Sequence, residues 1–137
     1  MNKLLEKYLT KEYPKIFVDM YGDPMKTCMT WGLSCADGWF FLIHNLCSQV
    51  QHHIDWVNRD YFADDNPKLK PTKEQIKARK GKKLVPQVVA LQVKEKFGTL
   101  RFYYSGGDEV IRGMFQLAES LSYFICENCF FSMPYNR

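Results

Sequence analysis

The sequence predicts a small α+β domain in which a β-hairpin or short antiparallel sheet packs against two or three helices. Apolar residues recur at helical spacing in two long segments. Between these segments lie an alternating apolar stretch, a glycine-containing turn and a second alternating stretch, which is typical of a hairpin. These elements can bury their apolar faces against one another through short connections. The 137 residues suit a single domain with one core, and no internal repeat is present.

The first 58 residues predict three helices. Residues 3–20 are rich in helix formers and contain Pro14, which separates them into two short predicted helices. A loop is expected over residues 21–36. A long helix is then expected over residues 38–58, with Asp37 as its N-cap. Its apolar stripe advances by three or four residues and consists of Trp39, Ile43, Leu46, Val50, Ile54 and Val57.

Residues 59–83 are predicted to form a basic linker or mobile loop, because their apolar periodicity fades. From Lys68 to Lys83 the chain has eight Lys and Arg residues against Glu74, a net charge of +7. A short helix is expected from Thr72 to Arg79, since Thr72 can cap it and Gln75 occupies the capping-box position.

The hairpin prediction begins with a strand from Val85. Alternation along this strand places Val85, Gln87, Val89, Leu91 and Val93 on one face. Residues 96–99 supply the turn and residues 100–105 the returning strand. Asp108 is the expected N-cap of the last helix, whose stripe comprises Ile111, Met114, Phe115, Leu117, Ala118, Leu121 and Phe124.

Composition points to a folded protein of the cytoplasm. No apolar run approaches the roughly 20 residues that a membrane helix needs, and the first ten residues lack a signal-peptide apolar stretch. Five cysteines, an odd number, argue against a disulfide framework in such a chain, so reduced thiols are expected.

Cys126 and Cys129 form a Cys-x-x-Cys pair, the arrangement in which two thiolates reach one tetrahedral metal. A structural zinc site takes four ligands, so further ligands must come from elsewhere. Cys35, with Cys28 seven residues before it, is the candidate within the chain. The preferred interpretation is that the thiols hold no metal, so no cofactor is predicted, and a zinc site is the alternative. Cys47 is interpreted as a core residue.

No catalytic pattern is present, so the chain is not predicted to be an enzyme. It lacks the His-Glu-x-x-His, Gly-x-Ser-x-Gly and Gly-x-x-x-x-Gly-Lys motifs. A metal-dependent enzyme built on Asp37, His52 or Asp108 with the cysteines is the last alternative. The other histidines and the Ser105–Asp108 turn are interpreted as structural.

The outward face of the hairpin is the main candidate binding site. If Val93, Leu100, Phe102 and Tyr104 face the helices, cationic and aromatic side chains project together on the other side: Lys94, Lys96, Arg101 and Tyr103. Such a face can grip phosphates or bases, and it also resembles an ordinary solvated strand. The basic run adds candidate phosphate or acidic-protein contacts at Lys77, Arg79, Lys80, Lys82 and Lys83.

Three segments together resemble a family of small uncharacterised phage and prophage proteins: Cys35-Ala36-Asp37-Gly38-Trp39, residues 93–103 (Val-Lys-Glu-Lys-Phe-Gly-Thr-Leu-Arg-Phe-Tyr) and Cys126-Glu127-Asn128-Cys129. The resemblance covers roughly residues 13–129. In the family, the last motif is often followed by a Cys and a His that complete a zinc knuckle. This chain has Ala36 at a usual glycine and Phe130 after the second cysteine, with no later Cys or His.

The resemblance implies a phage accessory protein but carries over no activity. Small phage proteins of this size commonly bind and block a host machine, including a defence complex. The leading hypothesis is therefore a non-enzymatic binder that inhibits or redirects a host protein or protein–nucleic-acid complex, without any membrane partner. The alternative is a nucleic-acid or nucleotide-binding protein, with or without a zinc knuckle.

Overall fold

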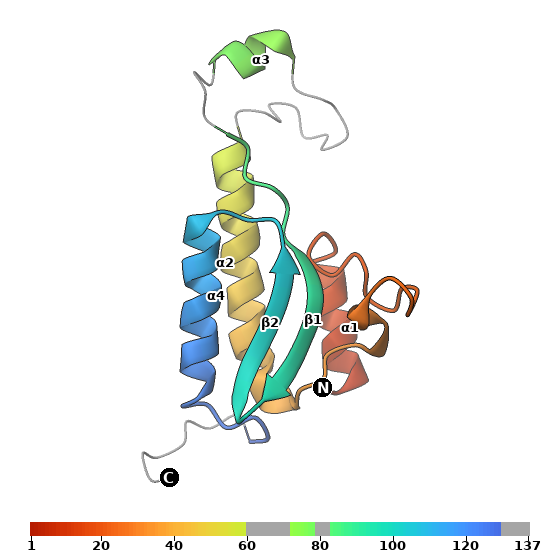
Figure 1. Cartoon of the computed structure of the whole chain (residues 1–137). Helices are drawn as coiled ribbons and strands as arrows, with labels where there is room; N and C mark the ends of the chain where they lie inside the picture. Colours follow the sequence, from red (N-terminus) through yellow and green to blue (C-terminus); the bar gives the residue numbers. More distant parts are fainter. Residues whose placement is uncertain (60–71, 79–82, 130–137) are drawn as a thin grey trace.

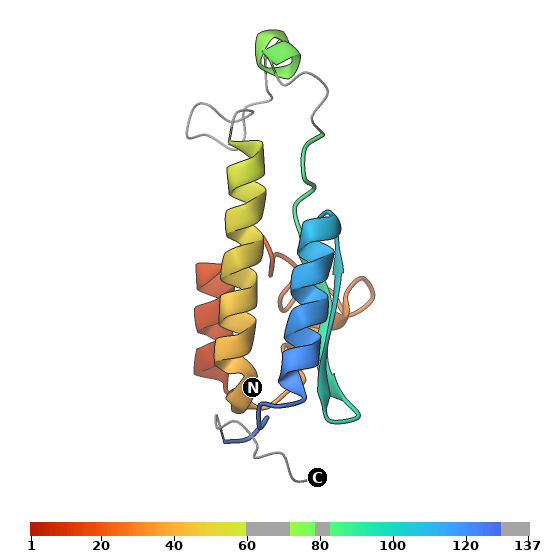
Figure 2. The ribbon, with the colours of Figure 1, turned by 90° about the vertical axis from the view of Figure 1, so that its left-hand side faces the viewer.

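The computed structural model is a small α+β domain, as predicted, and it describes residues 1–59, 72–78 and 83–129. The chain forms α1 (Lys3–Glu12), the 3-10 turns η1 (Cys28–Trp31) and η2 (Asp37–Trp39), α2 (Phe40–Asn58), α3 (Lys73–Ala78), β1 (Val89–Lys96), β2 (Thr99–Ser105) and α4 (Glu109–Ser122). β1 and β2 pair as an antiparallel hairpin. Figures 1 and 2 show α2 and α4 side by side behind this hairpin, with α1 against α2.

The core lies between the hairpin and the helices. Every main element contributes side chains that are almost completely buried, including Leu9, Ile43, Val50, Val93, Leu100, Ile111 and Phe115. Phe102 and Tyr104 of β2 pack on Phe115 of α4, with ring centroids 4.9 and 3.8 Å apart from it. Trp39 belongs to this core and is 1% exposed, whereas Trp31 is 75% exposed.

Of the two short helices predicted on either side of Pro14, the first is confirmed as α1. α1 begins after Asn2, whose side chain accepts a hydrogen bond from the Leu4 amide at 2.8 Å. The second helix predicted after Pro14 is wrong, because residues 14–21 form turns. The carbonyl of Ile16 accepts a hydrogen bond from the Ala90 amide of β1 at 2.8 Å. Other backbone hydrogen bonds of this segment close local turns, such as the Phe17 amide to the Tyr13 carbonyl at 3.1 Å and the Met20 amide to the Phe17 carbonyl at 3.0 Å.

The long helix is confirmed, but its start differs from the prediction. Asp37 does not cap α2; it begins the short turn η2, and the helix itself starts at Phe40. The Asp37 carboxylate instead accepts a hydrogen bond from the Asn2 amide at 2.5 Å. It thereby fixes the beginning of the chain to the segment that precedes α2.

A β-bulge changes the faces of the first strand. β1 begins at Val89, and the pairing register with β2 shifts between Ala90 and Gln92. The buried residues are Val88 and Ala90 before the bulge and Val93 after it, whereas Leu91 is 43% exposed. The predicted face through Val89, Leu91 and Val93 is therefore wrong. An extra residue in one strand reverses the alternation that follows it.

The turn, the returning strand and the cap of α4 agree with the sequence. Phe97 and Gly98 form a two-residue turn with φ angles of 54° and 76°, the backbone that a type I′ hairpin turn requires. Asp108 caps α4 by accepting a hydrogen bond from the Ile111 amide at 3.0 Å. The single stripe predicted for α4 is only partly buried, because Leu117, Leu121 and Phe124 are exposed.

The predicted short helix in the basic segment is confirmed as α3. Residues 60–71 and 79–82 lie outside the described part of the chain. Among the helices of the described residues, none is long and apolar enough to cross a membrane.

Candidate binding face of the hairpin

The four hairpin residues singled out in the sequence share one side of the sheet. Val93, Leu100 and Phe102 are buried against the helices, as expected. Since side chains alternate across a strand, the opposite side carries those residues, Lys94, Lys96, Arg101 and Tyr103, which we call the basic hairpin face. Lys94 lies directly opposite Arg101 in the register of the two strands.

Cations and aromatic rings are paired on and beside the basic hairpin face. The Lys94 ammonium lies 5.6 Å from the centroid of the Tyr103 ring. The Lys96 ammonium lies 5.4 Å from the ring of Phe97, which is 86% exposed at the tip of the turn. Sequence reasoning overlooked Phe97, although a large aromatic residue in a two-residue turn, where small residues prevail, was a usable signal. Arg101 differs from the lysines, because its guanidinium lies 3.7 Å from the Glu119 carboxylate of α4.

The outer edge of β1 is already hydrogen-bonded to other parts of the chain. Ser34 donates its amide to the carbonyl of Val93 at 2.9 Å and accepts from the Glu95 amide at 3.0 Å. The Ala90 amide is bonded to Ile16, as described above. A partner strand cannot use these groups without displacing the chain's own contacts.

The outer edge of β2 is capped by side chains of α4. The Leu100 amide donates to the Ser122 hydroxyl at 2.8 Å, and the Phe102 amide donates to the Glu119 carboxylate at 3.0 Å. Ser122 is 1% exposed, so this contact is shielded from water. The hairpin therefore offers a partner the side chains of its outer face more readily than its backbone edges.

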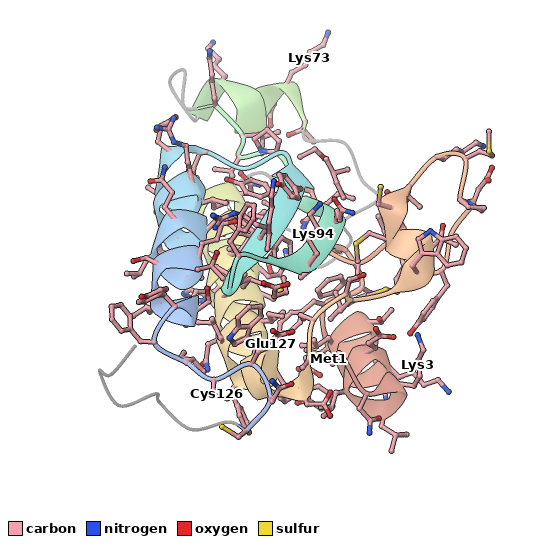
Figure 3. The ribbon with its side chains drawn as sticks, turned by 60° about the horizontal axis from the view of Figure 1, so that its bottom comes forward. Met1, Lys3, Lys73, Lys94, Cys126 and Glu127 are labelled. Carbon is pink, nitrogen blue, oxygen red and sulfur yellow. The ribbon has the colours of Figure 1, made fainter. Side chains whose placement is uncertain are left out.

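The lysine run does not join the basic hairpin face in the described structure. Lys77 of α3 and Lys83 are both exposed. Figure 1 places α3 beyond the C-terminal end of α2, and Figure 3 shows Lys73 of α3 well apart from Lys94 of β1. Arg79, Lys80 and Lys82, also predicted as binding residues, lie outside the described residues.

The Cys126–Cys129 pair forms a compact dithiol after α4. The pKa of the Cys126 thiol is lowered by a hydrogen bond with the Cys129 side chain and by the amides of Asn128 and Cys129. Cys35 differs, because burial raises the pKa of its thiol to about 12. Within residues 1–59, 72–78 and 83–129, no three His, Cys, Asp or Glu side chains are grouped to hold one metal ion. Within these residues Cys35 therefore does not complete a site with the pair, and bound zinc stays the untested alternative.

The dithiol loop is fastened to the segment that leads into α2. The Gly38 amide donates to the Glu127 carbonyl at 2.6 Å, and the Ala36 amide donates to the Glu127 carboxylate at 2.8 Å. The Trp39 indole donates to the carbonyl of Ile125 at 3.0 Å. We call these contacts the clasp; Figure 3 shows Glu127 and Cys126 together at this end of the molecule. The clasp joins the first and last segments of the family resemblance.

The three residues considered for metal-dependent catalysis have separate surroundings. Asp37 binds the Asn2 amide, and His52 is exposed on α2. Asp108 accepts a hydrogen bond from neighbouring His53 at 2.8 Å. Partial burial raises the pKa of Asp108, but hydrogen bonds from His53 and the Ile111 amide more than offset this, so its pKa is lowered. The His53–Asp108 pair thus ties α2 to the start of α4.

Comparisons with known proteins do not extend these observations. No protein-family model, no curated protein and no solved structure matches the chain.

Proposed function

We propose that the protein acts by binding an acidic macromolecular surface through the basic hairpin face, and that it does so without transforming a substrate. The observation that supports this proposal most directly is the pairing of Lys94 with Tyr103 and of Lys96 with exposed Phe97. Cations beside aromatic rings provide both charge attraction and apolar contact area on a rigid support.

The rigidity of the hairpin supports the same proposal. Its inner face packs on α4, and both of its edges are bonded within the chain. A partner would therefore meet a preformed surface, and little conformational entropy would be lost on binding. The resemblance to small phage proteins makes a host protein, or a host protein–nucleic-acid complex such as a defence machine, the partner we propose, with inhibition or redirection as the outcome.

Charge reversal on the hairpin tests this proposal. The double substitution Lys94→Glu and Lys96→Glu is expected to weaken binding to the host partner at least about tenfold, because attraction becomes repulsion at two adjacent points. The measurement is quantitative capture from nuclease-treated bacterial lysate, with the captured protein identified and then titrated as purified material.

The matched control is Lys7→Glu with Lys11→Glu on α1, which changes the net charge equally at two exposed lysines of another layer. Binding that survives the hairpin substitutions but is lost with the α1 substitutions would contradict the proposal. Equal loss with both pairs would mean that net charge, and not this face, determines binding.

Nucleic acid is the second candidate partner, because exposed Phe97 and the partly exposed ring of Tyr103 can stack on unpaired bases. If three cations of the face neutralise phosphates of a single strand, the logarithm of the binding constant should fall with the logarithm of salt concentration at a slope of about −2. Fluorescence anisotropy with a labelled single-stranded oligonucleotide measures this slope. Binding indifferent to salt, or indifferent to the hairpin substitutions, would exclude this candidate.

A further inference from the structure

The positions of the cysteines and histidines restrict where a zinc ion can bind. All five cysteines and all three histidines lie in the described residues. Within those residues no three potential ligands are grouped around one point. Structural zinc sites in proteins are built from four Cys or His ligands. One copy of this chain, in this fold, therefore supplies at most two such ligands at any point.

The Cys126–Cys129 loop nevertheless has the form of half a zinc site. Cys126 and Cys129 have the Cys-x-x-Cys spacing, and residues 127–129 between and at the end of the pair form a turn. The clasp holds this loop against residues 36–39 through the two hydrogen bonds of Glu127. A tight turn held in place by outer hydrogen bonds is the support that orients metal ligands. Cys129 is exposed, so the pair is open to a second molecule.

Apolar residues next to the pair provide a contact surface for that molecule. Leu117, Leu121 and Phe124 are 61%, 43% and 44% exposed. Their spacing of four and three residues places them in one row along α4 and its continuation, and the row ends two residues before Cys126. Exposed apolar side chains in a continuous row are characteristic of surfaces that become covered by a partner.

We propose that Cys126 and Cys129 of two copies of this chain together bind one zinc ion, which joins the copies into a symmetric dimer. Four thiolates, two from each copy, complete the tetrahedral site that neither copy can complete alone. A two-fold axis through the metal brings the same surface of each copy together, so the row ending at Phe124 meets its equivalent. This inference is independent of the hairpin proposal, because it uses other residues and its test measures zinc and mass, which the hairpin proposal does not predict.

The test measures stoichiometry and mass together on the full chain. Metal-free, reduced protein is titrated with zinc against a chromophoric chelator, and its mass is followed by light scattering during size-exclusion chromatography. We expect one zinc for every two chains and a change from 16.2 kDa to twice that mass, reversed by a chelator. Cobalt(II) in place of zinc should give the visible absorption of a tetrahedral thiolate site.

Cys129→Ser is the decisive variant, because Cys129 is exposed and its replacement should leave the fold intact. We expect it to lose both metal binding and dimer formation while its circular dichroism is unchanged. Cys28→Ser, at the other exposed cysteine, should behave like the unaltered chain. One zinc per single chain, no bound zinc, or a dimer that persists unchanged in chelator would each overturn the proposal. Loss of zinc in Cys28→Ser would also overturn it, since a ligand would then come from Cys28.

Discussion

At the scale of single residues, the buried carboxylate of Glu6 is the least expected feature of the chain. Glu6 is 1% exposed and accepts hydrogen bonds from Lys3 at 2.9 Å, from the Tyr21 hydroxyl at 2.9 Å and from the Leu33 amide at 2.8 Å. It thereby joins α1 to both ends of the loop that contains η1. A buried carboxylate is tolerated only when its oxygens are satisfied in this way.

The hydrogen bonds of Glu6 determine whether its contribution to folding stability rises or falls with pH. Burial raises the pKa of Glu6, but the bonds from Lys3, Leu33 and Tyr21 outweigh burial, so the folded-state pKa lies below its ordinary value. A lowered pKa stabilises the fold at pH values above the unfolded-state pKa. This contribution is lost as the pH falls through the folded-state pKa.

We predict that Glu6→Gln lowers the free energy of unfolding at pH 7 by about 1–3 kcal/mol. Lys3 and Tyr21 donate to one carboxylate oxygen and the Leu33 amide donates to the other, whereas an amide has a single accepting oxygen and places an NH2 group at the second position. The difference between the variant and the unaltered protein should shrink as the pH falls below about 4. Urea denaturation at both pH values measures this. Glu12→Gln, at an exposed position of the same helix, is the control and should change stability by no more than about 0.5 kcal/mol. A pH-independent loss in Glu6→Gln would show that packing, and not charge, is responsible.

At the scale of the elements, two glycines differ in whether the surrounding structure leaves room for a side chain. Gly113 is exposed within α4, and a Cβ added there meets nothing within 4 Å. Gly38 lies in η2, just before α2. A Cβ added to Gly38 would lie 2.2 Å from the Cys126 carbonyl oxygen and 2.4 Å from the Glu127 carbonyl oxygen. Gly113 therefore weakens α4, and no close contact explains why a glycine stands there. Gly38 is needed because the clasp leaves no room for a side chain.

We predict that Gly113→Ala stabilises the protein by about 0.8–1 kcal/mol, because alanine loses less backbone entropy in a helix. Gly38→Ala should destabilise it by about 1–3 kcal/mol, because backbone atoms must move apart. Thermal unfolding monitored by circular dichroism compares the two. A stabilising effect at Gly38, or a destabilising effect at Gly113, would contradict the contacts described for these positions.

The elements also show where sequence periodicity succeeds and where it fails. The two long helices, the hairpin turn and the Asp108 cap followed from local spacing and from residues with a defined local role. The bulge at Leu91 did not, because one extra residue is invisible to a pattern that assumes strict alternation. The helix predicted after Pro14 was also wrong, since this segment forms local turns and the Ile16 carbonyl bonds to Ala90 of β1, more than seventy residues later in the sequence.

At the scale of the whole molecule, the sequence predicted which residues share the basic hairpin face. It did not predict which parts of the chain pack around the hairpin. Lys94, Lys96, Arg101 and Tyr103 share a face because alternation in the second half of the hairpin is regular. That Glu119 and Ser122 cap the edge of β2, and that Cys126 and Glu127 lie against Gly38, depends on the tertiary arrangement of α4. Local spacing does not encode such contacts. The resemblance to the phage family did single out both segments of the clasp, residues 35–39 and 126–129, but not their contact.

The clasp connects the loop after α4 to the segment before α2. We predict that Glu127→Ala lowers the free energy of unfolding by about 1–2 kcal/mol, since the partly buried Ala36 amide loses its acceptor. Amide hydrogen exchange of Ala36 should accelerate, while the central amides of α2 keep their protection. Glu109→Ala, at an 85%-exposed side chain in the first turn of α4, is the control, with a change within about 0.5 kcal/mol. Unchanged exchange at Ala36 would mean that the Glu127 carboxylate does not hold the clasp closed.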